Sequence, residues 1–208
     1  RLHDGATLTE VTGEITAAWG LDCRLLPVTD DRIETRVSLP DDREVGFQEY
    51  FVGMQHSIDI TGVRFAGAEQ ARLSPMAIKA ITSADALVIA PSNPIVSIGP
   101  PLAVPTLQEL VEARRDRNVA VSPIIGGAAL KGPADRMLRE LGEESSVVGV
   151  ARRYRDLAAT LVIDEADRDL ASEVEDAGMR PIVMPTIMKQ PGVAAALAQA
   201  CHDAAMGV

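Results

Sequence analysis

The sequence is poor in cysteine and in positive charge, and it has no long hydrophobic run. Its two cysteines, Cys23 and Cys201, lie far apart with no second metal-ligating residue near either. A disulfide framework or a zinc site is therefore not expected, and we interpret both residues as reduced thiols of a cytoplasmic protein. No apolar stretch approaches the roughly 20 residues that cross a bilayer, so we expect no membrane partner.

The basic residues are few and dispersed. The 208 residues include 20 Lys and Arg against 30 Asp and Glu, which gives a net charge of −10. Proteins that bind nucleic acid usually present a basic face, and here the basic residues form no block. We therefore expect no nucleic-acid partner. A chain of this length with 47% hydrophobic residues is sufficient for one domain with a proper core.

The first predicted helix begins close to the first residue. Thr7 and Glu10 have the spacing of a capping box, in which each side chain satisfies a free backbone N–H of the first turn. Apolar residues at helical spacing continue to Trp19, which is expected in the core, and Gly20 ends the pattern. Because no initiator Met precedes this helix, we expect residues 1–208 to be a single α/β domain that forms the C-terminal part of a longer polypeptide.

The next segment is rich in predicted strands. Four runs of β-favouring residues cover residues 24–28, 33–37, 45–52 and 58–65. In the third run, the alternation from Phe47 to Val52 favours a half-exposed strand over a helix. Asp41 and Asp42 mark the tip of a hairpin.

From Ser74 onwards the pattern changes to alternating helices and strands. Ser74 and Pro75 predict an N-cap followed by a proline in the first helical turn. Short apolar strands are expected at residues 86–90, 119–122, 160–163 and 181–184, with helices at 75–83, 105–116, 133–141, 146–155, 168–177 and from about 191. The first of these strands is expected to be covered on both faces. This order predicts an α/β, Rossmann-like fold, with a mostly parallel sheet, helices on both of its faces and a strand-rich insertion.

Two loops occupy the positions where ligands bind in open parallel sheets, beyond the carboxyl ends of the strands. The loop after residues 86–90 carries Ser92, Asn93 and Ser97 among prolines, followed by Gly99. Its prolines fix the backbone, and its polar side chains can donate to phosphate or ribose oxygens.

The loop after residues 119–122 has a similar design. It contains Ser122, the pair Gly126 and Gly127 and, a few residues on, Lys131. Adjacent glycines let backbone N–H groups converge on an anion, and a lysine adds positive charge. Taken singly, each loop is more simply a stiff strand-to-helix turn, but two of them on successive strands favour an anionic, nucleotide-like ligand.

Acidic residues form a weaker set of candidates. Asp30 and Asp31 follow a predicted strand and offer the hard oxygen ligands that suit magnesium, although an acidic turn facing water explains them equally well. The acidic run at residues 164–169 is interpreted as a solvated face or a helix N-terminus, where negative charge is favoured. No Ser-His-Asp or Cys-His nucleophilic arrangement can be assembled.

Several longer motifs occur together along the chain. They are Phe-Gln-Glu-Tyr-Phe at 47–51, Ala-Pro-Ser-Asn-Pro-Ile-Val-Ser-Ile-Gly at 90–99, Val-Ser-Pro-Ile-Ile-Gly-Gly at 121–127 and Ala-Leu-Lys-Gly-Pro-Ala-Asp at 129–135. Together they resemble the signature of the CofD family, the 2-phospho-L-lactate or phosphoenolpyruvate transferases of coenzyme F(420) biosynthesis. The resemblance covers nearly the whole chain.

The resemblance implies transfer of a phospholactyl or phosphoenolpyruvyl group from a guanosine diphosphate-linked donor to the deazaflavin Fo, with release of GMP and assistance from Mg2+. Phosphoryl transfer requires mainly positioning and charge neutralisation. The resemblance places the GDP portion of the donor against Ser92, Asn93, Pro94, Ser97 and Gly99, with Ser122, Gly126, Gly127 and Lys131 as neighbours. As catalytic residues, Asp30 or Asp31 would orient the metal or the attacking hydroxyl. Whether the three-carbon group is lactyl, enolpyruvyl or glyceryl stays open.

The sequence departs from the family pattern at its start. Family members begin with a strand and a Gly-Gly-x-Gly-Gly type of loop, followed by an Asn/Asp-rich segment, and this sequence contains neither. We therefore expect an uncovered edge or face of the sheet, and a chain that is unstable or inactive alone.

Two alternatives to the transferase remain. The first is a non-enzymatic, nucleotide-sugar-binding regulator of the related gluconeogenesis-factor-like group, and the second is a generic structural domain, which explains the two polar loops least well. A homodimer is also open, because the Ala-rich final helix suits an interface or internal packing equally.

Overall fold

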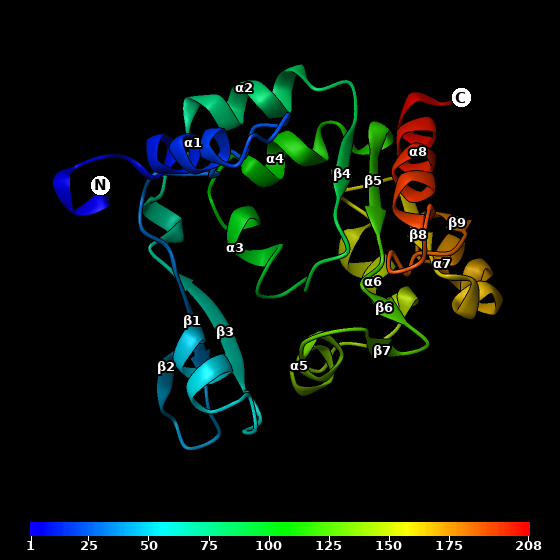
Figure 1. Cartoon of the computed structure of the whole chain (residues 1–208). Coiled ribbons are helices and arrows are strands. Elements are labelled where there is room, and N and C mark those ends of the chain that lie inside the picture. The colour runs from blue at the N-terminus through cyan, green and yellow to red at the C-terminus, as the bar shows by residue number, and fades with distance from the viewer.

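The computed structural model describes all 208 residues and contains one parallel sheet of four strands (Figure 1). The strands are β4 (Leu87–Ile89), β5 (Asn118–Val121), β8 (Thr160–Ile163) and β9 (Arg180–Val183), in the order β4-β5-β8-β9. Neighbouring strands pair in parallel throughout. The four strands lie close to their predicted positions, and the α/β, Rossmann-like prediction is confirmed.

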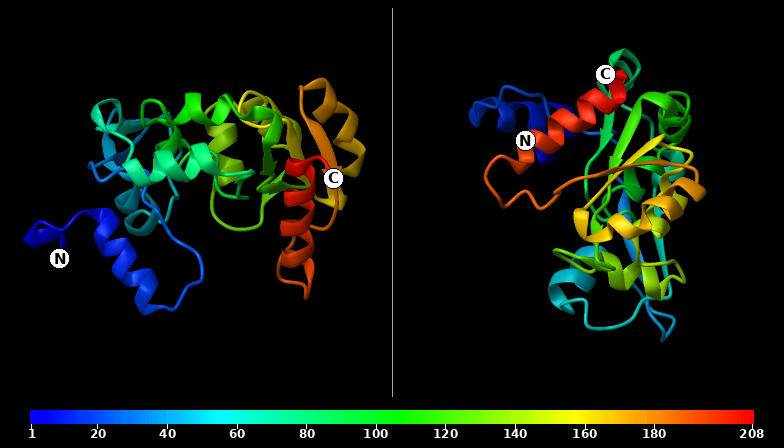
Figure 2. Two further views of the ribbon diagram at one scale, coloured as in Figure 1. Left: turned by 90° about the horizontal axis from the view of Figure 1, so that it is seen from above. Right: turned by 90° about the vertical axis from the view of Figure 1, so that its right-hand side faces the viewer.

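Helices pack on both faces of this sheet, as the alternation of helices and strands predicts. On one face, Leu197 and Cys201 of α8 (Val193–Met206) pack against Val119 and Val162. On the other face, the alternate residues of β5 and β8 belong to the main core together with buried side chains of α6 (Val147–Tyr154) and α7 (Ala171–Asp176). The right-hand view of Figure 2 shows α8 on one side of the strands and the yellow to orange helices on the other. One face of α8 is therefore used for internal packing.

The prediction that the first parallel strand is covered on both faces is wrong. β4 is an edge strand, and its central residue Val88 is 47% exposed. Trp19 was expected in the core but is 69% exposed, because α1 (Leu8–Ala18) buries only Thr16. An uncovered face of the sheet is thus present at β4, as the sequence predicts, and α1 lies apart from the rest of the molecule in the left-hand view of Figure 2.

The strand-rich insertion is a three-stranded antiparallel sheet. It contains β1 (Glu34–Ser38), β2 (Glu44–Gly46) and β3 (Gly62–Ala66) in the order β2-β1-β3, and residues 40–43 form the predicted hairpin tip. The strand predicted at residues 24–28 is absent, and β3 begins later than predicted.

The strand predicted through residues 47–52 is also wrong, because this segment is helical up to Gly53. The helical turn buries Tyr50 completely and lets its hydroxyl donate to the carbonyl of Ile58 at 3.1 Å. It also stacks Phe47 on Phe51, with ring centroids 5.5 Å apart. Packing of these aromatic rings therefore overrides the local alternation.

The predicted helix caps are present. Thr7 and Glu10 form the capping box, and the hydroxyl of Ser74 accepts an N–H at the start of α2 (Pro75–Ser83). The hydroxyl of Ser146 caps α6 in the same way, which the sequence analysis did not predict. The remaining helices are α3 (Gly99–Leu102), α4 (Leu107–Glu112) and α5 (Ala134–Glu140), with short 3₁₀ helices at Leu2–Asp4, Ala68–Gln70, Arg115–Arg117 and Glu165–Leu170. None of the helices has the length and apolar character that crossing a membrane would require.

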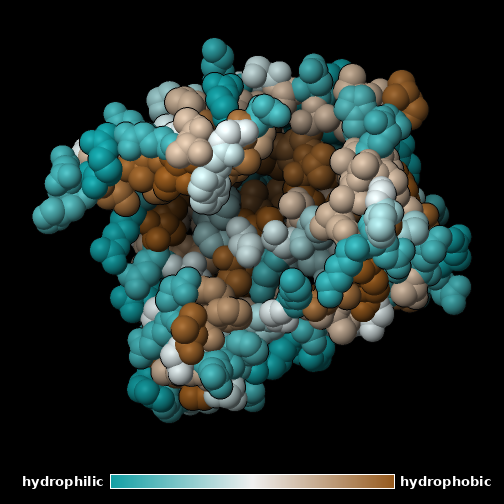
Figure 3. Space-filling model, in the orientation of Figure 1, coloured by the Kyte–Doolittle hydropathy of each residue, from teal (hydrophilic) through white to brown (hydrophobic).

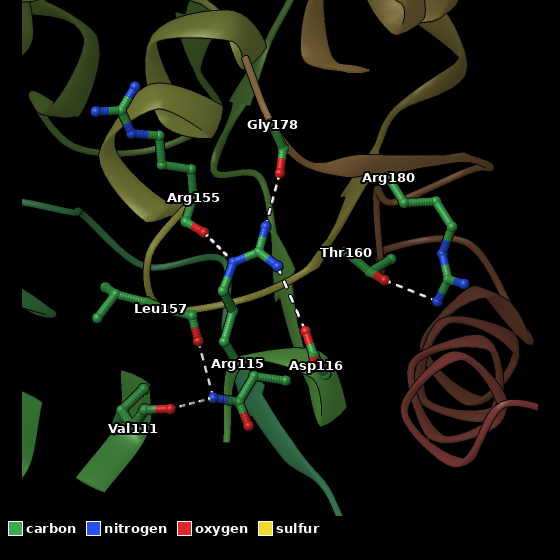
Figure 4. Close-up of polar contacts among 9 residues, drawn as sticks. Val111, Arg115, Asp116, Arg155, Leu157, Thr160, Gly178 and Arg180 are labelled. Atoms are coloured by element: carbon green, nitrogen blue, oxygen red, sulfur yellow. Dashed lines mark hydrogen bonds and ion pairs between the residues drawn. The ribbon is translucent and has the colours of Figure 1, made fainter. Parts of the chain in front are cut away.

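Polar side chains bind together the amino ends of the parallel strands (Figure 4). The amide nitrogen of Asn118, which is fully buried, donates to the carbonyls of Val111 and Leu157, both at 2.8 Å. The guanidinium of Arg115 donates to the carbonyls of Arg155 and Gly178. The side-chain donors of Asn118 and Arg115 at this end of the sheet are therefore used within the chain, while the buried side-chain oxygen of Asn118 has no partner.

Candidate functional site

A cavity of about 430 Å³ lies beyond the carboxyl ends of the parallel strands. Its walls come from the loops that follow β4, β5 and β9 and from a small hairpin formed by β6 (Ile124–Ile125) and β7 (Ala128–Ala129). This is the place where the topology of an open α/β sheet puts a ligand. The face of the molecule seen in Figure 1 is hollowed, with hydrophobic surface inside the hollow (Figure 3).

The cavity combines apolar walls with two free cations. Ile125, Leu130, Ile187 and Met188 supply much of the apolar lining. The sequence contains only three lysines, Lys79, Lys131 and Lys189, and the last two of them line this cavity. Every ion pair in the chain involves Arg, His or the N-terminus, so both lysines are without an acidic partner. Such a site suits a ligand with a flat apolar part and an anionic part.

Of the predicted site residues, the structure brings Asn93, Ser122 and Lys131 together in this cavity. The Ser122 hydroxyl is buried, donates to the carbonyl of Ile124 at 2.9 Å and accepts its N–H at 3.2 Å. The Asn93 carbonyl oxygen accepts the N–H of Ile95 at 2.9 Å, so it shapes its own loop. Of these three residues, Lys131 is therefore the one whose polar group has no partner within the chain and can bind a ligand.

Gly126 and Gly127 form the two-residue turn between β6 and β7. Their φ angles are 58° and 77°, which is the type I′ geometry that favours glycine at both positions. The N–H of Gly126 donates to both carboxylate oxygens of Asp167, at 3.1 and 3.0 Å. The dihedral requirement of a hairpin, which the sequence did not predict, therefore accounts for this glycine pair.

The other predicted site residues of the first loop lie outside the cavity. Pro94 and Gly99 line a separate hollow of about 320 Å³, and Ser92 and Ser97 line neither. A Cβ at Gly99 would come within 2.7 Å of the Phe65 ring. Close packing against the insertion therefore explains this glycine.

Asp30 and Asp31 lie in a third, open groove, away from the lysines. Asp30 accepts the N–H of Thr9 at 2.7 Å, and Asp31 accepts the N–H of Arg72 at 2.8 Å. Each carboxylate thus fixes a loop. No group of three or more His, Cys, Asp or Glu side chains in the 208 residues could hold a metal ion. The carboxylates of this chain do not by themselves fit the expected magnesium site.

The sequence analysis missed the third wall of the cavity. Residues 186–189 follow β9, and Thr186 and Lys189 both line the cavity. The signal was available, because this loop also lies beyond the carboxyl end of a predicted parallel strand. This loop has neither a glycine pair nor a Pro-Ser-Asn motif, so its composition did not identify it as part of a binding site.

Comparison with known proteins adds a family. A family model described as 2-phospho-L-lactate transferase CofD matches residues 1–200. A phosphoenolpyruvate transferase from Streptomyces griseus is 40% identical over 202 residues, which are 95% of this chain and 64% of the relative. A 2-phospho-L-lactate transferase from Methanosarcina barkeri is 34% identical over 187 residues, which are 90% of this chain and 60% of the relative.

The fold has solved counterparts as well. Protein BH3568 from Bacillus halodurans superimposes with a TM-score of 0.62 and 16% identity, over 93% of this chain and 68% of that one. A second structure of it, described as a member of the UPF0052 family, gives a TM-score of 0.60. At this identity the similarity shows the fold alone.

The alignments cover most of this chain but only part of each relative. The chain spans 60 to 64% of the length of the two transferases described above. The family model nevertheless accounts for almost all of the 208 residues. The chain belongs to the CofD family.

Proposed function

We propose that this chain is part of a transferase that moves a phospholactyl or phosphoenolpyruvyl group from a guanosine diphosphate-linked donor to the deazaflavin Fo, in cytoplasmic coenzyme F(420) biosynthesis. In this reaction a ribityl hydroxyl oxygen of Fo bonds to the phosphorus that carries the three-carbon group. The phosphoanhydride bond to GMP breaks, GMP leaves, and the hydroxyl loses its proton.

The observation that carries the proposal is the pair of unpartnered lysines at an apolar cavity, beyond the carboxyl ends of the strands. Lys131 and Lys189 line the cavity from two different loops, in a chain whose net charge is −10. Keeping two cations unpaired in an acidic chain is favourable when an anion binds between them. The apolar lining offers a surface for the flat guanine ring.

In the proposed complex, the lysines neutralise the diphosphate and hold the donor for in-line attack. Ser122 and Asn93 keep the two loops in shape through their bonds to Ile124 and Ile95. Assistance from Mg2+ stays a prediction, and no step here depends on a metal ion, because the chain's carboxylates do not gather into a site.

A thermal-shift titration tests the proposal. We expect GDP, with and without Mg2+, to raise the melting temperature of the chain, and a UDP-sugar to raise it less. Replacing Lys131 and Lys189 by alanine should remove the GDP response, while Lys79→Ala, which changes the lysine outside the cavity, should keep it. The absence of any GDP response in the wild-type chain would contradict the proposal.

The non-enzymatic regulator predicts a different result. It would respond to the UDP-sugar in preference to GDP. The same titration therefore separates the two functions.

A further inference from the structure

The connection between β8 and α7 holds two buried carboxylates that have no cation against them. Asp164 and Asp167 are only 8% and 4% exposed. The nearby Arg168 pairs with Glu165, at 3.5 Å, and with neither of them. Burying an ionised carboxylate is costly unless hydrogen bonds replace its water. The hydrogen-bond donors to Asp164 and Asp167 therefore indicate the role of these two carboxylates.

Asp164 binds the loop that carries Lys189. One of its oxygens accepts the backbone N–H of Thr186 at 2.8 Å and the Thr186 hydroxyl at 2.9 Å. The other accepts the N–H of Ala166 at 3.1 Å. Burial disfavours the charge on Asp164, yet the hydrogen bonds from Thr186 and Ala166 outweigh it and hold the pKa of this carboxyl below its usual value.

Asp167 binds the hairpin that leads to Lys131. Both of its oxygens accept the N–H of Gly126, which directly follows the cavity residue Ile125. Asp164 is the N-cap of the short 3₁₀ helix Glu165–Leu170, and Asp167 lies three residues later, at a kink in it. One short segment therefore holds two of the loops that line the cavity.

We propose that Asp164 and Asp167 are positioning residues, which fix the spacing of the two lysine-bearing loops for an anionic ligand. This inference rests on the proposed function. Neither carboxylate lines the cavity, so each acts through the loop that it holds. A small misplacement of the loops would separate the two ammonium groups and weaken a ligand that bridges them.

The test compares Asp164→Asn and Asp167→Asn with Asp169→Asn. Asp169 lies on the same segment but is exposed and makes no side-chain hydrogen bond or ion pair, which makes it a matched control. For each variant, calorimetry measures the GDP dissociation constant at a temperature where circular dichroism shows a folded chain. Amide hydrogen exchange, read by NMR without ligand, reports on the N–H groups of Thr186 and Gly126.

We expect faster exchange at Thr186 in Asp164→Asn and at Gly126 in Asp167→Asn, and GDP binding that is roughly tenfold weaker in both. Asp169→Asn should match the wild type in both measurements. GDP affinity within twofold of the wild type in both Asn variants would overturn the positioning role and leave the proposed function intact. If the wild-type chain does not bind GDP, the proposed function fails, and unchanged exchange at Thr186 and Gly126 would overturn the inference independently.

A milder pair of variants covers the case in which Asp164→Asn does not fold. Thr186→Val removes the hydroxyl donor and keeps the backbone N–H, whereas Thr186→Ser keeps both donors. Because Thr186 itself lines the cavity, Thr186→Ser is the reference: we expect Thr186→Val to bind GDP several-fold more weakly than Thr186→Ser and, without ligand, to show faster exchange of the amide at position 186. Equal affinity of the two variants would contradict the inference.

Discussion

The two ends of the parallel sheet are built for different purposes. At the amino end, Asn118 and Arg115 donate to main-chain carbonyls of neighbouring segments. At the carboxyl end, Lys131 and Lys189 have no acidic partner and line a cavity. The polar side chains at the amino end thus stabilise the fold, whereas the two lysines at the carboxyl end are available to bind a ligand.

This difference predicts that substitutions at the two ends affect different quantities, stability at one end and ligand affinity at the other. Changes at the amino end should lower stability and leave ligand affinity alone, since the side-chain donors there already bind main-chain carbonyls of the chain. Changes to the lysines should do the opposite, because exposed, unpaired charges contribute little to folding.

The largest effect is expected at Asn118. Replacing it by alanine removes the side-chain donor to the carbonyls of Val111 and Leu157, of which Val111 keeps the N–H of Arg114 at 3.1 Å, and it leaves a cavity in a fully buried site. We expect the free energy of unfolding in urea to fall by about 3 kcal/mol. Gln108→Ala, at an exposed helix position, is the control. A folded Asn118→Ala chain with altered GDP affinity would break the separation between the two ends.

The second effect concerns the lysines. The double change Lys131→Ala and Lys189→Ala should weaken GDP binding roughly thirtyfold, or about 2 kcal/mol, through the loss of two charge-assisted contacts. Its free energy of unfolding should stay within about 0.5 kcal/mol of the wild type. Calorimetry at two salt concentrations gives a further check, since the wild-type affinity alone should fall clearly with salt. Lys79→Ala serves as the control.

A smaller effect is expected at Arg115. Alanine at this position removes the donors to the carbonyls of Arg155 and Gly178 and should cost about 1 kcal/mol of stability. Arg117→Ala, which removes an exposed guanidinium with no hydrogen bond, should cost less. If both variants unfold at the same urea concentration, the Arg115 contacts contribute nothing to the fold.

The smallest effect is a pH dependence at the carboxyl end. The pKa of Asp164 lies below its usual value of 3.8 in the folded chain. Its stabilising contribution is therefore present at neutral pH and is lost as the pH falls from about 3.8 through the folded-state pKa. The stability difference between wild type and Asp164→Asn should shrink over that range in urea titrations. A difference that is constant from pH 7 to pH 3 would contradict the ionised state assigned to Asp164.

Much of the sheet and its helices follows from local sequence rules. The strand at residues 160–163 and the caps at Thr7 and Ser74 lie where apolar runs and hydroxyl residues predict them. The first two cavity loops also follow, because the carboxyl ends of parallel strands and their composition point to them. Local chemistry and tertiary structure agree in these places.

The remaining features depend on contacts between distant segments. The helical turn at Tyr50 and the exposure of Trp19 are decided by which surfaces are available to pack, and the sequence pattern gives no sign of these. The buried state of Asp164 and Asp167 has the same origin. Asp164 and Asp167 accept hydrogen bonds from Thr186 and Gly126, which lie some 20 to 40 residues away in the sequence. From the sequence alone, a run of acidic residues therefore predicts a solvated surface, because the positions of these loops are not known.

The central claim is that the cavity at the carboxyl end binds a nucleoside diphosphate. The most direct test is an NMR map of amide shifts on addition of GDP to the 208-residue chain. We predict shifts in residues 122–131 and 186–189, none around Arg115 and Asn118, and the loss of the shifts when Lys131 and Lys189 are replaced by alanine. Shifts confined to the groove of Asp30 and Asp31, or a GDP response that survives the double lysine change, would contradict the claim.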